Sequence, residues 1–473
     1  MMKRKIAIYI ILIGVVIGSA PYLTGMLVES KFDDVINLIS QTETVPAKIT
    51  VLDYHRGWRK STAKTAVTFY SDRQNKLKEY HLIFNHTLRH GPFVQLQDDN
   101  WKDWEFAQAV VISNLALTKE AEKIIKEEVG QTQLVGLNSI FAMDGSVSIL
   151  ATAPVLKLKE HQGTDRVAFK GLRGEWLISA NMKEIKSHVM LPGMDFDLEG
   201  AHFFAANLNY YTHLSQSPSG LWPGRFDGKL DKLMLVLNQG KFKLNLEGFS
   251  TQGLLRDQGS VTDLYGEFHV DKLTLNEKVY GPIDYSNTLK HVDTQLLKSF
   301  LTLNYQLKTG DLSAKNKMLQ FFLTRLPDFL STRPEFSVDK LFIHTASGDV
   351  NGQLYAAIGG VEANNVSNIP QVLKSIVAKA KLEIPKTMIR DMLVLQFSKE
   401  TQEKQASQTS PTSTQETIVI LSPEQLADET INKWLQAGTL VQKDQLYEIN
   451  IDFKEGNFLV NGRVNQIPIP LKK

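Results

Sequence analysis

The feature that most constrains the fold is an alternation of apolar and polar residues that persists from Lys48 to about Val270. Phe242, Leu244 and Leu246 alternate with polar residues, and similar runs recur upstream and downstream. This period of two is typical of half-buried antiparallel strands. Glycines that follow Asp or Gln separate the runs and indicate tight turns. The middle of the chain is therefore predicted to form extended antiparallel sheets.

Helical spacing interrupts this pattern once and becomes frequent after about residue 287. A Ser-Pro-Glu-Gln sequence at 422–425 carries the serine cap, the early proline and the glutamine that open many helices, and Gly438 should end this one. The other helices are predicted at 119–129, 289–305, 318–330 and from 385 onward. Strands are predicted to resume at 336–344, 352–359, 447–453 and 457–461. The Gln/Ser/Thr-rich stretch at 399–416 is predicted to be a solvated loop.

The N-terminus carries the pattern of a membrane anchor. A basic cluster at 3–5 precedes an apolar stretch without charge up to Glu29, long enough to span a bilayer. Gly18-Ser19-Ala20 would suit a signal peptidase, but Pro21 after the cut and the continuing apolar run favour an uncleaved anchor. The positive charges predict a cytoplasmic N-terminus and a periplasmic body. We therefore expect a single-pass protein of the bacterial inner membrane, with the anchor continuing as a short amphipathic helix over 29–45.

Composition removes several classes of function. The formal net charge of +2 gives no electrostatic basis for nucleic-acid binding, and the absence of cysteine excludes disulfides, thiolate metal sites and cysteine nucleophiles. The chain lacks a Gly-x-Ser-x-Gly elbow, a Ser-x-x-Lys pair and phosphate-binding glycine loops. No cofactor, metal or nucleic-acid partner is therefore expected, and we predict that the protein is not an enzyme.

The candidate site residues lie in two short strings, Tyr54-His55-Arg56-Gly57-Trp58 and His90-Gly91-Pro92-Phe93. His86 and His90 have a spacing that would suit a metal on a helix, but this segment is predicted to be a strand, so surface and turn histidines are favoured. The strings admit two interpretations: a polar site built on His55, Arg56 and His90, or a bulge at Gly57 with Trp58 in the core and a Gly-Pro turn. The structural alternative is favoured. The candidate residues are Tyr54, His55, Arg56, Gly57, Trp58, His90, Gly91 and Pro92.

These strings also carry a resemblance. They occur with the apolar leader ending in Pro21-Tyr22-Leu23-Thr24-Gly25, with Leu326-Pro327 before Pro334, and with a closing hairpin through Gly456. In this order and over nearly the whole chain, the sequence resembles the YdgA-like family of bacterial cell-envelope proteins, a domain of unknown function. The resemblance implies an inner-membrane-tethered, mainly periplasmic protein without accepted enzymatic activity, and it supplies no catalytic residue.

The predicted fold is α+β, with an N-terminal transmembrane helix and a β-rich body of extended antiparallel sheets carrying several packed helices. Its parts are an anchor at 1–28, a β-rich periplasmic region at 29–286 and an α+β periplasmic region at 287–473. The favoured function is envelope assembly or maintenance, or lipid handling, because alternating strands create an apolar surface that needs covering. An anchored envelope hydrolase and a homo-oligomeric interaction protein are the alternatives. The expected partners are the inner membrane, a lipid or envelope protein, and a second copy through the helices at 288–330.

Overall fold

The computed structural model describes most of the chain. The described residues are 20–38, 47–73, 76–96, 104–129, 134–159, 166–308, 313–359, 369–407 and 421–464. They fall into two compact units. Unit 1 comprises Met1–Leu244, Gln252–Ser260 and Thr294–Arg325, and unit 2 comprises Asn245–Thr251, Val261–Asp293 and Leu326–Lys473.

Unit 1 contains one continuous antiparallel sheet. Its strands pair in the order β1, β2, β3, β5, β6, β7, β8, β9, β10, β11, and the short β4 pairs with β5. The strands are β1 (Ala47–His55), β2 (Lys60–Arg73), β3 (Lys76–His90), β4 (Phe93–Gln95), β5 (Trp104–Leu115), β6 (Gly136–Ala142), β7 (Val147–Lys159), β8 (Arg166–Ile178), β9 (Glu184–Leu198), β10 (Ala201–Ser215) and β11 (Gly224–Leu237). Short connections between consecutive strands, such as residues 199–200 between β9 and β10, favour antiparallel pairing.

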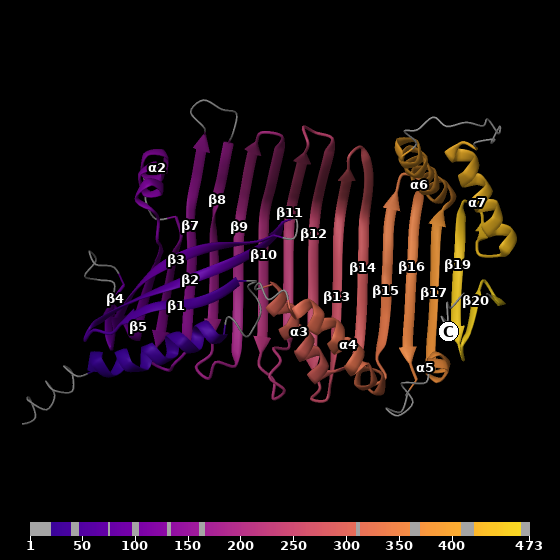
Figure 1. The fold of residues 1–473 in the computed structure, drawn as a ribbon. Coiled ribbons are helices and arrows are strands. Elements are labelled where there is room, and N and C mark those ends of the chain that lie inside the picture. The colour runs from indigo at the N-terminus through magenta and orange to yellow at the C-terminus, as the bar shows by residue number, and fades with distance from the viewer. Residues whose placement is uncertain are drawn as a thin grey trace, which may run out of the picture. The chain divides into compact units, whose positions relative to one another are not determined.

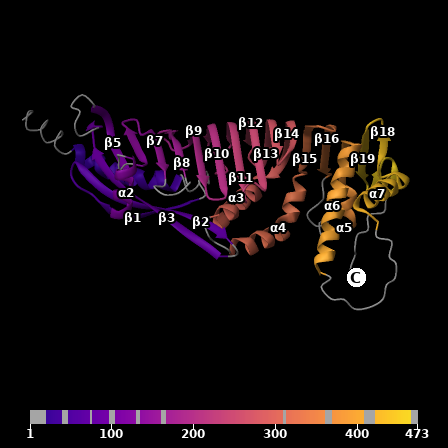
Figure 2. The same cartoon turned by 90° about the horizontal axis from the view of Figure 1, so that it is seen from above.

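The sheet of unit 1 folds over itself. Figure 2 shows β1, β2 and β3 diverging from the later strands, so that they form a second layer opposite β7–β10. An N-terminal helix at 20–38, indigo in Figure 1, packs against the sheet. Its apolar residues Val28, Phe32 and Val35 are at most 7% exposed and join a core built from strands of both layers. The helices α2 (Lys119–Val129) and α3 (Thr294–Lys308) also belong to this unit.

Unit 2 contains a second antiparallel series of strands. They pair in the order β13, β14, β15, β16, β17, β19, β20, β21, with β18 beside β19. The strands are β13 (Val261–Leu275), β14 (Lys278–Asp293), β15 (Glu335–Thr345), β16 (Gly348–Ile358), β17 (Ile376–Pro385), β18 (Val441–Lys443), β19 (Leu446–Lys454), β20 (Asn457–Val460) and β21 (Arg463–Val464). Strand β12 (Phe242–Asp257) and helix α4 (Ser313–Ser331) contribute residues to both units.

Two helices of unit 2 share a core with strand β19. The helices α6 (Lys386–Ser407) and α7 (Pro423–Ala437) pack together, and a short helix α5 (Ile369–Ser375) precedes β17. Ile389 and Leu393 of α6 meet Ala427 and Ile431 of α7, with Tyr447 of β19 completing this core. The predicted start of α7 is confirmed, because Ser422 and Gln425 form a capping box and Gly438 ends the helix at a φ of 76°.

The predicted fold class and location need correction. Within each unit the strands form one sheet instead of several, and no helix in the described part of the chain is both long and apolar enough to cross a membrane. This finding overturns the predicted transmembrane helix and the predicted single-pass inner-membrane location. Residues 1–19, which hold most of the predicted span, lie outside the described residues. The apolar residues of the helix at 20–38, such as Val28, pack on the sheet. Hydropathy alone does not distinguish burial against a sheet from burial in lipid, which is why the transmembrane prediction is wrong.

Three secondary-structure predictions also differ from the structure. Residues 289–293 continue β14, and helix α3 begins only at Thr294. Helix α6 extends to Ser407, into the stretch predicted to be a loop from 399. Of the helix predicted over 29–45, residues 29–38 belong to the N-terminal helix and 39–45 lie outside the described residues. The helix predicted at 119–129 and the strands at 336–344 are confirmed.

Candidate functional site

A cavity remains between the two layers of unit 1, next to the N-terminal helix. Its volume is about 510 Å³, and we call it the inner cavity. Strand residues whose side chains point to the same face line it, because side chains alternate between faces along a strand. The described lining residues are Phe32, Val35, Ile36, Leu38, Ile49, Thr65, Val67, Phe84, His86, Val111, Ser113, Leu137, Ser139, Phe141, Ile149, Trp176, Ile178, Ile185, Ser187, Val189, Tyr210, Thr212 and Leu214. None of them is Lys, Arg, Asp or Glu.

Thr65, His86 and Ser113 form a buried polar triad in the wall of this cavity. His86 of β3 lies between two hydroxyls on neighbouring strands: its Nε2 is 2.8 Å from the Thr65 Oγ1, and its Nδ1 is 2.7 Å from the Ser113 Oγ. The ring of Phe32 meets the imidazole edge to face at 5.3 Å. Burial lowers the pKa of His86 to about 4, so the imidazole is neutral at pH 7. The triad is therefore an uncharged hydrogen-bonding group in an apolar wall.

A second pair of hydroxyls lies on the opposite layer. The Oγ of Ser187 on β9 and the Oγ1 of Thr212 on β10 are 2.7 Å apart, and both residues are half-buried. Trp176 of β8 is the cross-strand partner of Ser187, and Tyr210 lies two residues before Thr212 on the same face. Burial raises the pKa of the Tyr210 phenol, so this side chain is also uncharged at pH 7.

Two of the predicted site residues, His90 and Gly91, contact the N-terminal helix near its start. His90 is 4% exposed; its Nε2 lies 2.9 Å from the Ser61 Oγ, and its Nδ1 lies 3.2 Å from the Trp58 carbonyl oxygen. The helix approaches so closely that a Cβ on Gly25 would lie 2.5 Å from the imidazole of His90. The Thr24 hydroxyl also lies 3.3 Å from the Gly91 carbonyl oxygen. These contacts hold the helix on the strands.

Other members of the two strings have separate surroundings. The Arg56 guanidinium donates to Glu29 of the helix at 3.1 Å and lies 5.4 Å from the centre of the Tyr22 ring. The ring of Tyr54 packs 6.3 Å from that of Phe32. The Pro92 carbonyl accepts a hydrogen bond from the amide of Ala107 on β5 at 3.0 Å.

The prediction of a bulge at Gly57 with Trp58 in the core is wrong in both details. Trp58 is 58% exposed and does not enter the core. The irregularity of β1 falls between Val51 and Asp53, whereas Gly57 lies in the turn that follows this strand. A Cβ on Gly57 would lie 2.3 Å from the Lys60 carbonyl oxygen, so the turn needs glycine for close backbone approach.

The strings do not assemble the polar site of the hydrolase hypothesis. The imidazole of His55 has 75% of its surface exposed and lies 3.0 Å from Asp53, Arg56 is paired with Glu29, and His90 with Ser61. Ser61 is 1% exposed, so the buried Ser61–His90 pair has no access for a substrate. Within the described residues, no three His, Asp or Glu side chains lie close enough to hold a metal ion.

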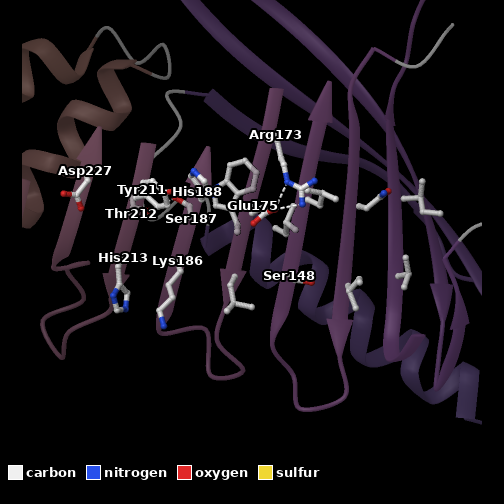
Figure 3. A pocket seen from close by; sticks show the side chains of 18 of the residues that line it. Ser148, Arg173, Glu175, Lys186, Ser187, His188, Tyr211, Thr212, His213 and Asp227 are labelled. Atoms are coloured by element: carbon white, nitrogen blue, oxygen red, sulfur yellow. Dashed lines mark hydrogen bonds and ion pairs between the residues drawn. The ribbon is translucent and has the colours of Figure 1, made fainter. Parts of the chain in front are cut away.

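The opposite face of the same strands has a second hollow, the outer groove, of about 750 Å³ (Figure 3). A cross-strand row of Glu175, His188, Tyr211 and Asp227 runs over β8–β11. The rings of His188 and Tyr211 stack at 3.9 Å. Glu175 accepts from Arg173 at 2.7 Å, and Asp227 accepts two hydrogen bonds from Arg225 at 2.8 and 2.7 Å. Arg173 and Arg225 therefore neutralise the two carboxylates of this row.

The residues that characterise the inner cavity are not among the predicted site residues. His86 was predicted to be a surface or turn histidine, whereas it is 8% exposed. Thr65 and Ser113 carried no signal, because they lie 21 and 27 residues from His86 and meet it only through strand pairing. The one available signal was the place of His86 between Phe84 and Leu88, since side chains two residues apart on a strand share a face and its neighbours there are apolar.

Comparison with known proteins gives a family. A family model described as "Bacterial protein of unknown function (DUF945)" matches residues 1–468. No curated protein and no solved structure matches the chain. The resemblance to the YdgA-like family is compatible with this match, which does not itself carry that name. The chain therefore belongs to the bacterial DUF945 family.

Proposed function

We propose that this member of the DUF945 family is a non-enzymatic lipid-handling module, which binds the hydrocarbon part of an amphipathic lipid in the inner cavity. The observation that carries the proposal is the cavity of about 510 Å³ with an uncharged, mainly apolar lining. Protein interiors are normally packed to the density of organic crystals, and unfilled space lowers stability. A cavity of this size is therefore better explained by an occupant than by incomplete packing.

The chemistry of the lining selects the part of the ligand that enters. Pockets of about 300–1,000 Å³ with apolar walls and a few polar groups are typical small-molecule sites. A charged headgroup inside this cavity would have no partner of opposite charge and would lose its hydration. The bound portion is thus an uncharged chain or ring system, and a charged head stays outside.

The first experiment measures bound lipid directly. The full chain is purified from bacteria without detergent, extracted with organic solvent and analysed by mass spectrometry, and binding of a dansyl-labelled fatty acid is measured by fluorescence. We expect co-purified lipid and saturable binding of the probe. Absence of both would show the proposal to be wrong.

A pair of variants on one strand locates the binding. Ser139 of β6 lines the inner cavity, and its neighbour Asn138 is exposed on the opposite face. Ser139→Phe should lower the amount of bound probe at least several-fold, because the ring occupies the cavity. Asn138→Phe adds the same ring on the other face and should leave binding unchanged. Equal binding by both variants would place the ligand elsewhere.

A further inference from the structure

The triad in the wall of the inner cavity has a hydrogen-bonding requirement that the protein does not meet. Thr65, His86 and Ser113 are 4%, 8% and 3% exposed, so water reaches them only through the cavity. Within the described part of the chain, His86 is the one hydrogen-bond partner of both hydroxyls. Buried polar groups in proteins are nearly always satisfied, so an unsatisfied one calls for an explanation.

Counting hydrogens shows which group is left over. A neutral imidazole has one N–H donor and one lone-pair nitrogen, and each hydroxyl has one O–H donor. One hydroxyl donates to the lone-pair nitrogen, while the other accepts from the N–H. The second hydroxyl keeps its own O–H without an acceptor. This result is the same for both tautomers of His86, which differ only in whether Thr65 or Ser113 holds the spare donor.

The Ser187–Thr212 pair does not create the same requirement. One of its two hydroxyls also keeps an O–H, but both residues are half-buried and in contact with solvent. Water can therefore accept from this pair. Among the cavity-lining hydroxyls of the described residues, those of the triad on β2, β3 and β5 are the ones that belong to nearly fully buried side chains, so the spare O–H of the triad has the strongest need of an acceptor.

We infer that the ligand of the inner cavity presents an uncharged oxygen acceptor, such as the carbonyl of an acyl ester, to the Thr65–His86–Ser113 triad. This inference rests on the proposed function and narrows it, since a pure hydrocarbon has no such oxygen. A carboxylate is disfavoured, because no Lys or Arg lines the cavity to compensate its charge. The ligand is thus an oxygen-bearing neutral group on an apolar chain.

The test compares two probes of equal chain length, the ester methyl palmitate and the alkane octadecane, as competitors of the dansyl-labelled fatty acid. Satisfying one buried donor should make the ester bind the full-length protein roughly tenfold more tightly than the alkane. The triple variant Thr65→Val/His86→Phe/Ser113→Ala makes the triad apolar while keeping a ring beside Phe32, and it should lose the preference. Thr62→Val, an exposed position on the same strand, is the matched control and should keep it.

A spectroscopic measurement covers the case in which the triple variant does not fold. Methyl palmitate labelled with ¹³C at the carbonyl is bound to the wild-type protein, and its infrared carbonyl band should shift to the lower frequency of a hydrogen-bonded ester. Thr65→Val or Ser113→Ala, whichever removes the spare donor, should change this shift.

The outcomes separate the inference from the proposed function. If ester and alkane bind equally well and the carbonyl band is unshifted, the cavity binds lipid but the inference about its oxygen is wrong. If neither competitor displaces the probe, the proposed function fails and the inference fails with it.

Discussion

Replacing Ser139 by phenylalanine should stabilise the protein, although the same change in a packed core would destabilise it. Ser139 lies in the middle of the inner cavity wall, between Val111 of β5 and Ile149 of β7. Within the described residues its hydroxyl makes no hydrogen bond, so none is lost on substitution. Phenylalanine also suits a strand position better than serine does.

The expected magnitude follows from the empty space in front of Ser139. Burying a phenylalanine side chain contributes about 1.5–3 kcal/mol relative to leaving it exposed. Forcing a larger side chain into a packed core instead costs about 1–3 kcal/mol. The sign of the change in unfolding free energy therefore distinguishes a hollow site from a filled one. Ala109→Phe supplies the contrast, since Ala109 is fully buried in the core of unit 1 and does not line the cavity.

The assay is urea-induced unfolding of the delipidated protein, followed by tryptophan fluorescence, which includes Trp176 in the cavity wall. With a urea dependence of about 3 kcal/mol per molar, a gain of about 2 kcal/mol raises the midpoint by roughly 0.7 M. Ala109→Phe should lower the midpoint by a similar amount. A lower midpoint for Ser139→Phe would refute the reasoning, because it would mean that the space in front of Ser139 is filled by protein.

Three further predictions concern stability. Burial lowers the pKa of His86 to about 4 from 6.5, so the unfolded chain takes up the proton first as the pH falls, and stability is lost between about pH 6.5 and 4. From pH 7 to pH 5, the free energy of unfolding measured with urea should fall by about 2 kcal/mol more in the wild type than in His86→Phe. An equal fall in both proteins would contradict the lowered pKa of His86. A Cβ on Gly91 would lie 1.8 Å from the Ala107 carbonyl oxygen, so Gly91→Ala should cost about 1–3 kcal/mol, and an unchanged melting temperature would argue against this contact. Ser422→Ala removes the capping box of α7 and should lower the free energy of thermal unfolding by about 1 kcal/mol. The control Ser148→Ala, at an exposed strand position, should lower it by less than about 0.5 kcal/mol, as is usual for surface substitutions.

Short sequence motifs predicted those helices and strands whose ends depend on hydrogen bonds between residues close in the sequence. The Ser-Pro-Glu-Gln sequence at 422–425 predicted the start of α7, because the cap and its reciprocal hydrogen bond are both local. The end of β14 was mistaken for a helix for an equally local reason. The left-handed φ of 58° at His291 breaks the alternation of the strand, so that Leu289 and Val292 have the spacing of a helix.

The inner cavity could not be predicted in the same way. Apolar alternation predicted an apolar sheet face, but not what covers that face. The apolar N-terminal stretch continues through Val28, and hydropathy does not distinguish the burial of Val28 in the protein core from burial in a bilayer. The triad depends on pairing between β2, β3 and β5, and register between strands is a property of the folded chain.

The inner cavity and the outer groove are separated by a partition only one strand layer thick. Ile149, Trp176, Ser187 and Thr212 line both hollows, so the backbone of these four residues is the wall between them. A closely packed sheet is stiff, and a residue pushed toward one side takes space from the other. Any occupant that bends this partition therefore changes the room available on the opposite face, and the indole of Trp176 is placed to report the change through its fluorescence.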